Sequence, residues 1–290
     1  MFLVTGAAGL SGRAVVDEFV RQGVPVRAMV RDAGRVDGLA DRPGVEVVVG
    51  DMMRPLELGP ALDGVERVLL VSTGDDHLLE AQCTFIDAAK RAGVQHIVKF
   101  SGQESGIGFD PYRFRFTRNH EQIQRYLEGS GIAWTHLRPS QFMQVYLRQA
   151  GTVATRGILP LPFGDIRLAP VDNHDVAQVA FALLTGDGHA GKRYAMTGPE
   201  ALSMEEIAAT IAAVRGAPVT YIQISAEDYR AAIIANGGPA YFADALYDQT
   251  VERLRNPDSR IVLETHEAFG VTPTRFADFA RRHAEAFRRP

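Results

Sequence analysis

The first twenty-two residues decide the fold. The apolar run Met1-Phe-Leu-Val-Thr5 leads directly into Gly6-Ala-Ala-Gly9-Leu-Ser-Gly12, and Arg13–Gln22 then has the periodicity of an amphipathic helix. A strand, a glycine-rich turn and a helix in this order are the parts that hold a dinucleotide pyrophosphate. A tight turn without a ligand can use the same glycines, but the position of this turn between strand and helix favours a cofactor.

Each glycine of the turn has an expected role. Gly6 allows a sharp turn off the strand, Gly9 lets backbone N–H groups approach the phosphates, and Gly12 lets the helix pack tightly on the strand. We expect the neighbouring residues of the turn to contact the cofactor as well: Thr5, Ala8, Leu10 and Ser11.

Composition narrows the class of protein. The chain has 290 residues, 46% of them hydrophobic and 23% charged, with a net charge of -4, which predicts an ordinary globular protein and no partner of nucleic acid or membrane. Cys83 is the one cysteine, and the eight histidines are scattered, so no metal site is expected. No signal peptide is recognised at the N-terminus, and a cytoplasmic location is expected.

The first half of the chain alternates strand and helix patterns. Strands are predicted at Phe2–Thr5, Val24–Val30, Val45–Val49, Val68–Ser72, His96–Ser101 and Ala133–Leu137. Helices are predicted at Leu10–Gln22, Pro55–Leu62, Asp76–Ala92 and Phe114–Gly129. Because these strands are apolar along most of their length, they indicate a parallel sheet covered on both faces. We therefore predict an α/β Rossmann fold, a doubly wound parallel sheet, over residues 1–150.

The pattern changes in residues 151–290, which predict a small substrate-binding lobe from which part of the chain returns to the sheet. Gly151–Gly164 is typical of a loop or small-strand region, Ile166–Val171 of a strand and Asp172–Thr185 of a helix. Ser203 and Glu206 form a capping-box pattern before a further helix. Strands are also expected at Lys192–Thr197 and Val219–Ile224, and helices at Ala226–Ala235, Pro239–Arg255 and Thr274–Phe287.

The end of the second strand distinguishes the two nicotinamide cofactors. Arg31 follows the apolar run there, and its guanidinium suits the 2′-phosphate of NADPH. Asp32 leaves NADH open, because an acidic side chain turned inward would hold the ribose hydroxyl. NADPH is the expected cofactor.

Residues that follow two further strands are also expected to contact NADPH. Asp51 follows the third strand and could accept from the adenine amino group while Met52 packs on the ring, although Asp51 could equally cap its own loop. Ser72 and Thr73 follow the fourth strand, where small residues let a cofactor pass closely.

Several segments together resemble the NmrA-like family, an atypical branch of the short-chain dehydrogenase/reductase superfamily. They are Val4–Gly12, Met29–Asp32, Gly50-Asp51, Val98–Ser101, Ser130–Pro139 and Val171–Ala177. The resemblance implies a Rossmann domain with a small C-terminal substrate lobe. It also implies that Lys99, Ser101 and Arg138-Pro139-Ser140 lie near the nicotinamide half of the cofactor, although Lys99 as a surface charge and Ser101 as a strand-end cap remain alternatives.

The chain departs from the superfamily at its catalytic helix. Typical members carry Tyr-x-x-x-Lys there, whereas the corresponding positions here are Phe116 and His120. Phe116 cannot donate a proton. Ser101 could instead hydrogen-bond the substrate oxygen, and His120, which is expected to titrate near neutrality, could donate or relay a proton, hold a ribose hydroxyl or simply be exposed.

This departure favours a substrate that accepts hydride with little acid assistance. We predict an NADPH-dependent reductase of an aromatic, quinoid or polyketide-like carbonyl compound. Phe109, Tyr112, Phe142 and Met143 are expected to contact it, although Phe109 and Tyr112 could equally cover a helix. A redox-sensing regulator that binds the cofactor and a partner protein is the main alternative. A nucleotide-sugar epimerase is disfavoured, because such enzymes generally keep the tyrosine and lysine.

Overall fold

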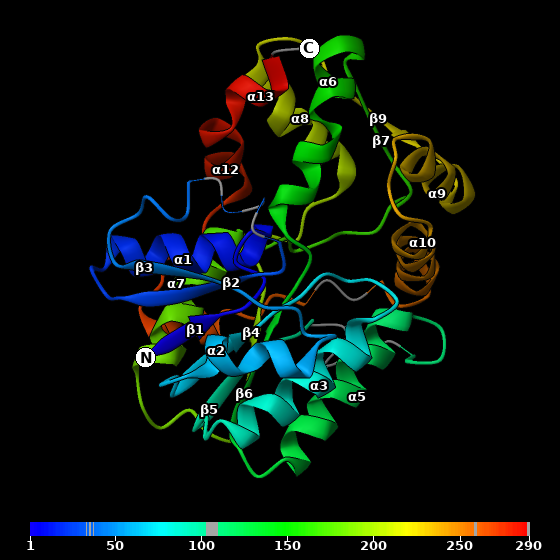
Figure 1. Cartoon of the computed structure of the whole chain (residues 1–290). Helices are drawn as coiled ribbons and strands as arrows, with labels where there is room; N and C mark the ends of the chain where they lie inside the picture. Colours follow the sequence, from blue (N-terminus) through cyan, green and yellow to red (C-terminus); the bar gives the residue numbers. More distant parts are fainter. Residues whose placement is uncertain (33, 35, 37, 103–109, 258–259, 289–290) are drawn as a thin grey trace. The chain divides into compact units, whose positions relative to one another are not determined.

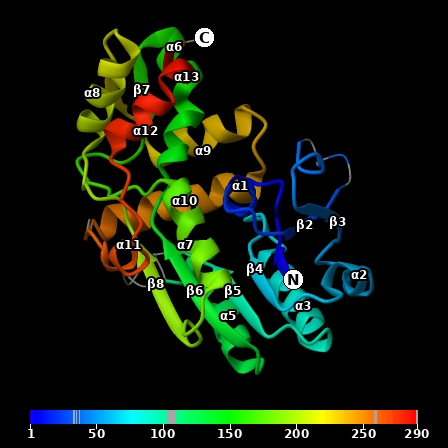
Figure 2. The same ribbon diagram turned by 90° about the vertical axis from the view of Figure 1, so that its left-hand side faces the viewer.

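The computed structural model describes residues 1–32, 34, 36, 38–102, 110–257 and 260–288. Its main sheet has seven strands in the order β3-β2-β1-β4-β5-β6-β8. The strands are β1 (Phe2–Val4), β2 (Val26–Val30), β3 (Val45–Val49), β4 (Arg67–Leu70), β5 (His96–Phe100), β6 (Ala133–Pro139) and β8 (Lys192–Met196). Neighbouring strands from β3 to β6 pair in parallel, and β4, β5, β6 and β8 can be followed side by side in Figure 2. The predicted doubly wound α/β fold is confirmed.

Helices cover both faces of this sheet (Figure 1). On one face lie α1 (Leu10–Arg21) and α7 (Asn173–Thr185), whose Phe19 and Phe181 rings are 4.8 Å apart between centroids. On the other lie α2 (Leu58–Leu62), preceded by the 3-10 turn η2 (Pro55–Glu57), α3 (Leu78–Arg91) and α5 (Arg115–Gly129). The two-sided cover explains why β5 is buried at every position.

The strand order reverses between β1 and β4, and this reversal positions the ligand edge of the sheet. The chain leaves β1 toward α1 on one face and leaves β4 toward α3 on the other. A crevice opens at the carboxyl ends of two such strands, where cofactors bind in folds of this kind. The glycine-rich turn therefore follows the strand at the switch point.

The chain divides into two compact units that are interleaved in sequence. The first comprises residues 1–105, 118–138 and 176–194, and the second residues 106–117, 139–175 and 195–290. The expected boundary at residue 150 differs from this division. Residues 139–150 belong to the second unit instead of the first. Most of α7 and the start of β8 belong to the first unit, where α7 covers one face of the sheet and β8 is the strand at one edge.

The second unit has its own two-stranded parallel sheet and a helical core. Its elements are η3 (Met143–Gln149), α6 (Ala150–Arg156), β7 (Ile158–Leu161), α8 (Met204–Arg215), β9 (Thr220–Gln223), α9 (Ala226–Ala235), α10 (Ala240–Arg255), α11 (Glu264–Phe269), α12 (Phe276–Arg282) and α13 (Ala284–Arg288). Helices α8, α12 and α13 group together in Figure 2. Their buried apolar residues form one cluster that includes Ile207, Phe276 and Phe279.

The helices and strands predicted for residues 151–290 agree with the structure only in part. The capping box at Ser203 and Glu206 is confirmed, and it begins α8. Ile166–Val171 is not a strand: Leu168 and Val171 make only isolated bridges, to Leu202 and Phe142, so no continuous ladder forms. The region expected as a loop or small strands contains most of helix α6 and then the short strand β7, and the region expected as one helix from Thr274 is divided between α12 and α13.

Two kinds of feature are absent from the described residues. In that part of the chain no helix has the length and apolar character needed to cross a membrane. The same residues contain no group of three or more His, Cys, Asp or Glu side chains placed to hold a metal ion.

Candidate active site

The turn after β1 has two positions, Gly6 and Gly12, that leave no room for a side chain. Gly6 has a φ of +57°, and a Cβ on it would lie 2.8 Å from the Val71 carbonyl oxygen. A Cβ on Gly12 would lie 2.3 Å from the Gly6 oxygen. Both distances are far below van der Waals contact with atoms that cannot move aside. The tight turn and close helix packing expected of these two glycines are therefore present.

Thr5 anchors this turn to the end of β4. It is buried, its Oγ1 donates to the Val71 carbonyl oxygen at 2.6 Å, and the Val71 N–H donates back to Oγ1 at 2.9 Å. Its hydroxyl thus holds together the two strands between which the sheet order reverses. A cofactor contact of Thr5 remains a prediction.

The N-terminus of α1 fits an anion. Gly9 is its N-cap and offers no side chain, and the helix ladder begins with the Arg13 N–H donating to the Gly9 oxygen at 2.9 Å. The N–H groups of Ser11 and Gly12 precede that first bond, at the end of the helix with positive partial charge. Ala8 is half-buried, and Gly9 and Leu10 are exposed. The residues present therefore fit a bound pyrophosphate.

Arg31 and Asp32 are both exposed at the end of β2, but only the side chain of Asp32 has a hydrogen-bond partner among the described residues. Asp32 Oδ1 accepts from the Gly34 N–H at 2.9 Å, so this carboxylate caps its own loop. Within the described part of the chain no hydrogen bond or ion pair engages the Arg31 guanidinium. Asp32 is thus engaged in its own loop, and a 2′-phosphate contact of Arg31 remains a prediction.

The ends of β3 and β4 are also ordered by local bonds. Asp51 Oδ1 accepts from the Met53 N–H at 2.9 Å, while Met52 is almost completely buried. Ser72 is half-buried and its Oγ accepts from Gln82 Nε2 at 2.9 Å, whereas Thr73 is exposed. Asp51 therefore caps its own loop, and a contact of Asp51 with adenine remains a prediction.

Polar side chains near the carboxyl end of β5 form two pairs with polar side chains of α5. Lys99 and Ser101 are two residues apart on β5 and its end, and His120 and Gln124 are one helical turn apart on α5. Lys99 Nζ lies 3.1 Å from His120 Nδ1, and Gln124 Nε2 donates to Ser101 Oγ at 2.8 Å. Each of the two expected catalytic residues is therefore held by a partner from the other element: Ser101 by Gln124 of α5, and His120 by Lys99 of β5.

Lys99 is not a surface charge. Its side chain is completely buried, and Nζ also donates to the Phe100 carbonyl oxygen. Burial lowers the pKa of Lys99 to about 7, against a small opposing effect of Cys83. Among these residues, Lys99 is the group that titrates near neutral pH.

His120 behaves differently from the expectation of a group that titrates near neutrality. Burial, and then the neighbouring Lys99, lower the pKa of His120 well below its ordinary value. Its imidazole is therefore neutral at physiological pH. Since Lys99 Nζ faces Nδ1, the other ring nitrogen, Nε2, carries the proton of the neutral ring when Lys99 is protonated.

The remaining predicted residues lie in the second unit. Pro139 ends β6, and Ser140 Oγ donates to the Ala169 carbonyl oxygen at 2.8 Å. Tyr112 is 89% exposed, Phe142 is half-buried, and Met143 is buried in the core cluster, where it has a packing role. Contacts of these residues with cofactor or substrate remain predictions. Phe109 lies outside the described residues.

Phe116, at the position of the missing tyrosine, has an aromatic environment. Its ring centroid lies 5.8 Å from that of Phe114 and 6.2 Å from that of Tyr241 on α10. The neighbouring Arg115 places its guanidinium over the Tyr241 ring and donates to Asp248 at 2.6 Å. These contacts fix the first turn of α5 to α10.

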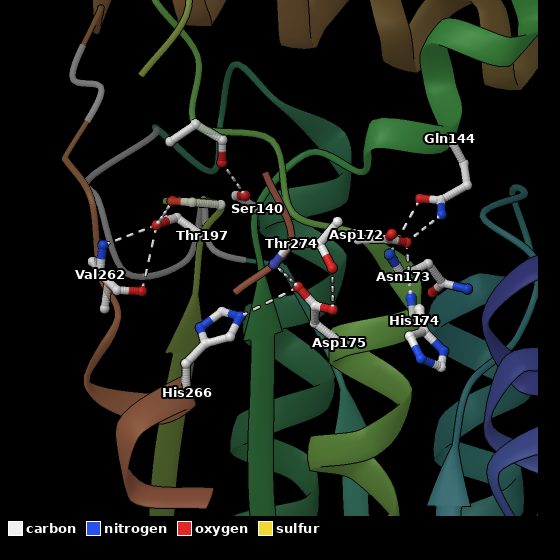
Figure 3. A network of polar contacts seen from close by, with 12 residues as sticks. Ser140, Gln144, Asp172, Asn173, His174, Asp175, Thr197, Val262, His266 and Thr274 are labelled. Atoms are coloured by element: carbon white, nitrogen blue, oxygen red, sulfur yellow. Dashed lines mark hydrogen bonds and ion pairs between the residues drawn. The ribbon is translucent and has the colours of Figure 1, made fainter. Parts of the chain in front are cut away.

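The segment from Asp172 to Asp175 has a structural role (Figure 3). Asp172 is buried and accepts from the His174 N–H, from Gln144 Nε2 at 2.7 Å and from Arg282 Nη1 at 2.9 Å. Asp175 accepts from the Thr274 N–H and hydroxyl, both at 2.7 Å. These bonds tie the start of α7 to η3 and to the segment before α12, so the carboxylates serve as helix caps and ties.

Sequence reasoning missed Gln124 and the role of Arg138. Arg138 donates through Nε, at 3.1 Å, and through Nη2 to Gln124 Oε1, which continues the contact of Gln124 with Ser101. The one signal in the sequence is the four-residue spacing of Gln124 from His120, which places both on one face of the helix.

Comparisons with known proteins agree with this architecture. The model of the family described as the NmrA-like family matches residues 1–273. An NAD(P)H azoreductase of Xenophilus azovorans is 36% identical over 290 residues, covering 99% of each chain. A (4-alkanoyl-5-oxo-2,5-dihydrofuran-3-yl)methyl phosphate reductase of Streptomyces griseus is 37% identical, with 99% of each chain covered. The crystal structure of an NADPH-dependent quinone oxidoreductase of Escherichia coli, complexed with NADPH, has a TM-score of 0.85 and 28% identity, covering 97% of this chain and 99% of that one.

Proposed function

The chain belongs to the NmrA-like family, and from this premise we propose that it reduces the carbonyl group of a small aromatic or quinoid compound with NADPH. Two coarser expectations are confirmed by the relatives. The chain is an NAD(P)H-dependent oxidoreductase, as the related azoreductase, furanone phosphate reductase and quinone oxidoreductase are by name. The expected cofactor, NADPH, is the one bound in the similar quinone oxidoreductase structure.

The residues that would hold the cofactor follow from the strand ends. The turn from Gly6 to Gly12 takes the pyrophosphate on the N-terminus of α1, and Arg31 takes the 2′-phosphate. Asp51, Met52, Ser72 and Thr73 line the adenosine side, and Pro139 and Ser140 the nicotinamide side. NADPH, when bound, supplies hydride.

A single observation carries the choice of substrate. At the carboxyl end of β5, Ser101 and the Lys99–His120 pair supply polar hydrogens, while Phe116 removes the phenol that usually protonates the substrate oxygen. A quinone accepts hydride into a conjugated ring and develops a stabilised oxyanion, so it needs little acid strength. Hydrogen-bond donors are sufficient for such an oxygen.

The chain's own residues divide this task. The Ser101 hydroxyl donates a hydrogen bond to the substrate oxygen as its negative charge grows. The proton that completes the product leaves His120 Nε2, while Nδ1 of the same ring takes a proton from Lys99 Nζ at 3.1 Å. Because the pKa of Lys99 is about 7, this relay holds a proton to give near neutral pH.

We propose that Phe109, Tyr112 and Phe142 contact the substrate, whereas Met143 packs in the core cluster instead. Placing the activity in the cytoplasm is also part of the proposal, since a single cysteine fits a reducing compartment.

The test is NADPH oxidation, followed by loss of NADPH absorbance, with quinones, hydroxylated aromatic ketones and simple aliphatic ketones, and with NADH alongside. We expect turnover of quinones or hydroxylated aromatics with NADPH preferred, and little with aliphatic ketones. Ser101→Ala should lower kcat and leave NADPH affinity unchanged.

Two results would contradict the proposal. High activity on aliphatic ketones that His120→Ala abolishes would show that the site works by strong acid catalysis. Tight NADPH binding without turnover of any carbonyl compound would favour a redox-sensing regulator, and the search would turn to a protein partner.

A further inference from the structure

Gln124 lies between a cation and a hydroxyl, and both ends of its amide are occupied. Arg138 of β6 donates to Gln124 Oε1 through Nε, at 3.1 Å, and through Nη2, while Gln124 Nε2 donates to Ser101 Oγ at 2.8 Å. Gln124 and Ser101 are buried and Arg138 is half-buried. Water therefore competes little for these bonds.

The chemistry of arginine fixes the direction of the whole chain of bonds. A guanidinium has only donors, so the amide oxygen of Gln124 must face Arg138. The amide nitrogen then faces Ser101 and can only donate. Rotating the amide by half a turn would set N–H groups against N–H groups at Arg138, at the cost of a buried bond to a charged donor.

The fixed direction of the Gln124 amide limits where the hydroxyl hydrogen of Ser101 can point. The Gln124 N–H occupies a lone pair of Oγ, so this hydrogen must point elsewhere, and among the described residues no acceptor engages it. We propose that Gln124, held by Arg138, is a positioning residue that keeps the Ser101 hydroxyl as a hydrogen-bond donor toward the substrate oxygen. This inference rests on the reductase function proposed above.

The direction of this bond matters because the site has no phenol. A serine hydroxyl can donate or accept, and only the donating orientation stabilises an oxygen that gains negative charge. A hydroxyl that had to find its orientation in the transition state would lose part of this effect. Arg138 and Gln124 fix the orientation beforehand.

Two variants of Gln124 with similar shape separate positioning from packing. Gln124→Glu keeps the bond to Arg138, but its carboxylate accepts from Ser101 and draws the hydroxyl hydrogen away from the substrate. Gln124→Met removes both bonds and leaves the hydroxyl free to rotate toward the substrate. We expect Gln124→Glu to lower kcat about 100-fold, as for loss of one oxyanion donor. Gln124→Met should lower it less than about 10-fold.

The stability order should be the reverse of the activity order. Gln124→Glu should keep the melting temperature, because Arg138 retains an acceptor, whereas Gln124→Met should lower it by a few degrees. KM for the substrate and Kd for NADPH should change less than about twofold in Gln124→Glu, since the lost interaction forms only in the transition state. A kcat within about threefold of wild type in Gln124→Glu, or an equal loss in both variants, would overturn the inference.

A measurement on the cofactor-free protein is independent of turnover. Nuclear magnetic resonance of the Gln124 side-chain amide should show slow hydrogen exchange, and Ser101→Ala should shift its signals and speed that exchange. Ser203→Ala, which changes a helix cap in the other unit, should leave them unchanged. Absence of turnover with every carbonyl compound would overturn the proposed function but not the contact between Gln124 and Ser101. Gln124 signals that do not respond to Ser101→Ala would overturn the positioning contact, whatever the activity.

Discussion

The turn after β1 and the end of β5 both lie at carboxyl ends of strands in one sheet, but they are built in opposite ways. The turn depends on absent side chains: a Cβ at Gly12 would lie 2.3 Å from the Gly6 oxygen. The end of β5 depends on present ones, because Ser101 and Lys99 are each held by a residue of α5. One region presents backbone to a ligand, and the other presents oriented side chains.

The difference explains which chemistry each region can perform. Backbone N–H groups at a helix N-terminus suit any pyrophosphate and carry no proton to transfer. A hydroxyl, an imidazole and a buried ammonium can be tuned by their surroundings, as the lowered pKa of Lys99 shows. We therefore propose that cofactor binding depends on the turn, and that the adjustable chemistry belongs to β5 and α5. Four substitutions test this contrast.

Gly12→Val should have the largest effect, because it places side-chain atoms against backbone that cannot yield. We expect the free energy of unfolding to fall by about 3 kcal/mol or more, in line with overpacking of a tight site, and NADPH binding to be lost. Chemical denaturation and NADPH fluorescence measure the two. Gly129→Ala at the end of α5, where an added Cβ meets nothing within 4 Å, is the matched control and should be neutral. A stable Gly12→Val protein that binds NADPH would contradict this account of the turn.

Lys99→Met should change how stability depends on pH. The pKa of Lys99 is about 7 in the folded protein, against an ordinary value of 10.5 that the solvated side chain has in the unfolded chain. The unfolded chain thus binds more protons between these values, and the free energy of unfolding rises with pH by up to about 1.4 kcal/mol per unit. We expect Lys99→Met to remove about 1 to 2 kcal/mol of that rise between about pH 7 and pH 9. Denaturation at a series of pH values measures it.

The control for this change is Lys90→Met, which removes an exposed lysine of α3 in the same unit. It should keep the slope of the wild type. If Lys99→Met and Lys90→Met gave the same pH dependence as the wild-type protein, Lys99 would not be a buried titrating group, and the proton relay through His120 would lose its source.

Arg31→Ala tests the part of the contrast that concerns cofactor binding. Arg31 is exposed, so its contact with a 2′-phosphate is screened by salt, and we expect about a tenfold loss of NADPH affinity with NADH affinity unchanged. Asp32→Ala should leave both affinities nearly unchanged, because the Asp32 carboxylate bonds the Gly34 N–H. Titrations of both cofactors decide the matter. A loss of NADH binding in Asp32→Ala would instead assign the ribose contact to Asp32.

The same contrast decides what could be predicted from sequence. The glycines and the apolar strands act locally, so the turn and the parallel sheet could be predicted. Ile166–Val171 could not, because its apolar pattern suits a strand while the fold gives it only two single bridges. Gln124 is a polar residue in a polar helix, and its role arises from Arg138 and Ser101, which only the folded sheet brings to it. The expectation that His120 titrates near neutral pH failed for the same reason, since burial and Lys99 lower its pKa.

Phe116→Tyr should have the smallest effect and is the sharpest test of the β5 region. In typical relatives of the superfamily a lysine one helical turn later lowers the pKa of the catalytic tyrosine, but here that position is His120, which is neutral and faces Lys99. A restored phenol therefore keeps a pKa near 10 and adds little acid strength at neutral pH. We expect kcat for quinones to change less than about threefold and the melting temperature to hold, since the ring keeps its contacts with Phe114 and Tyr241. A large gain in kcat would mean that the missing phenol, rather than the orientation of Ser101, limits the reaction.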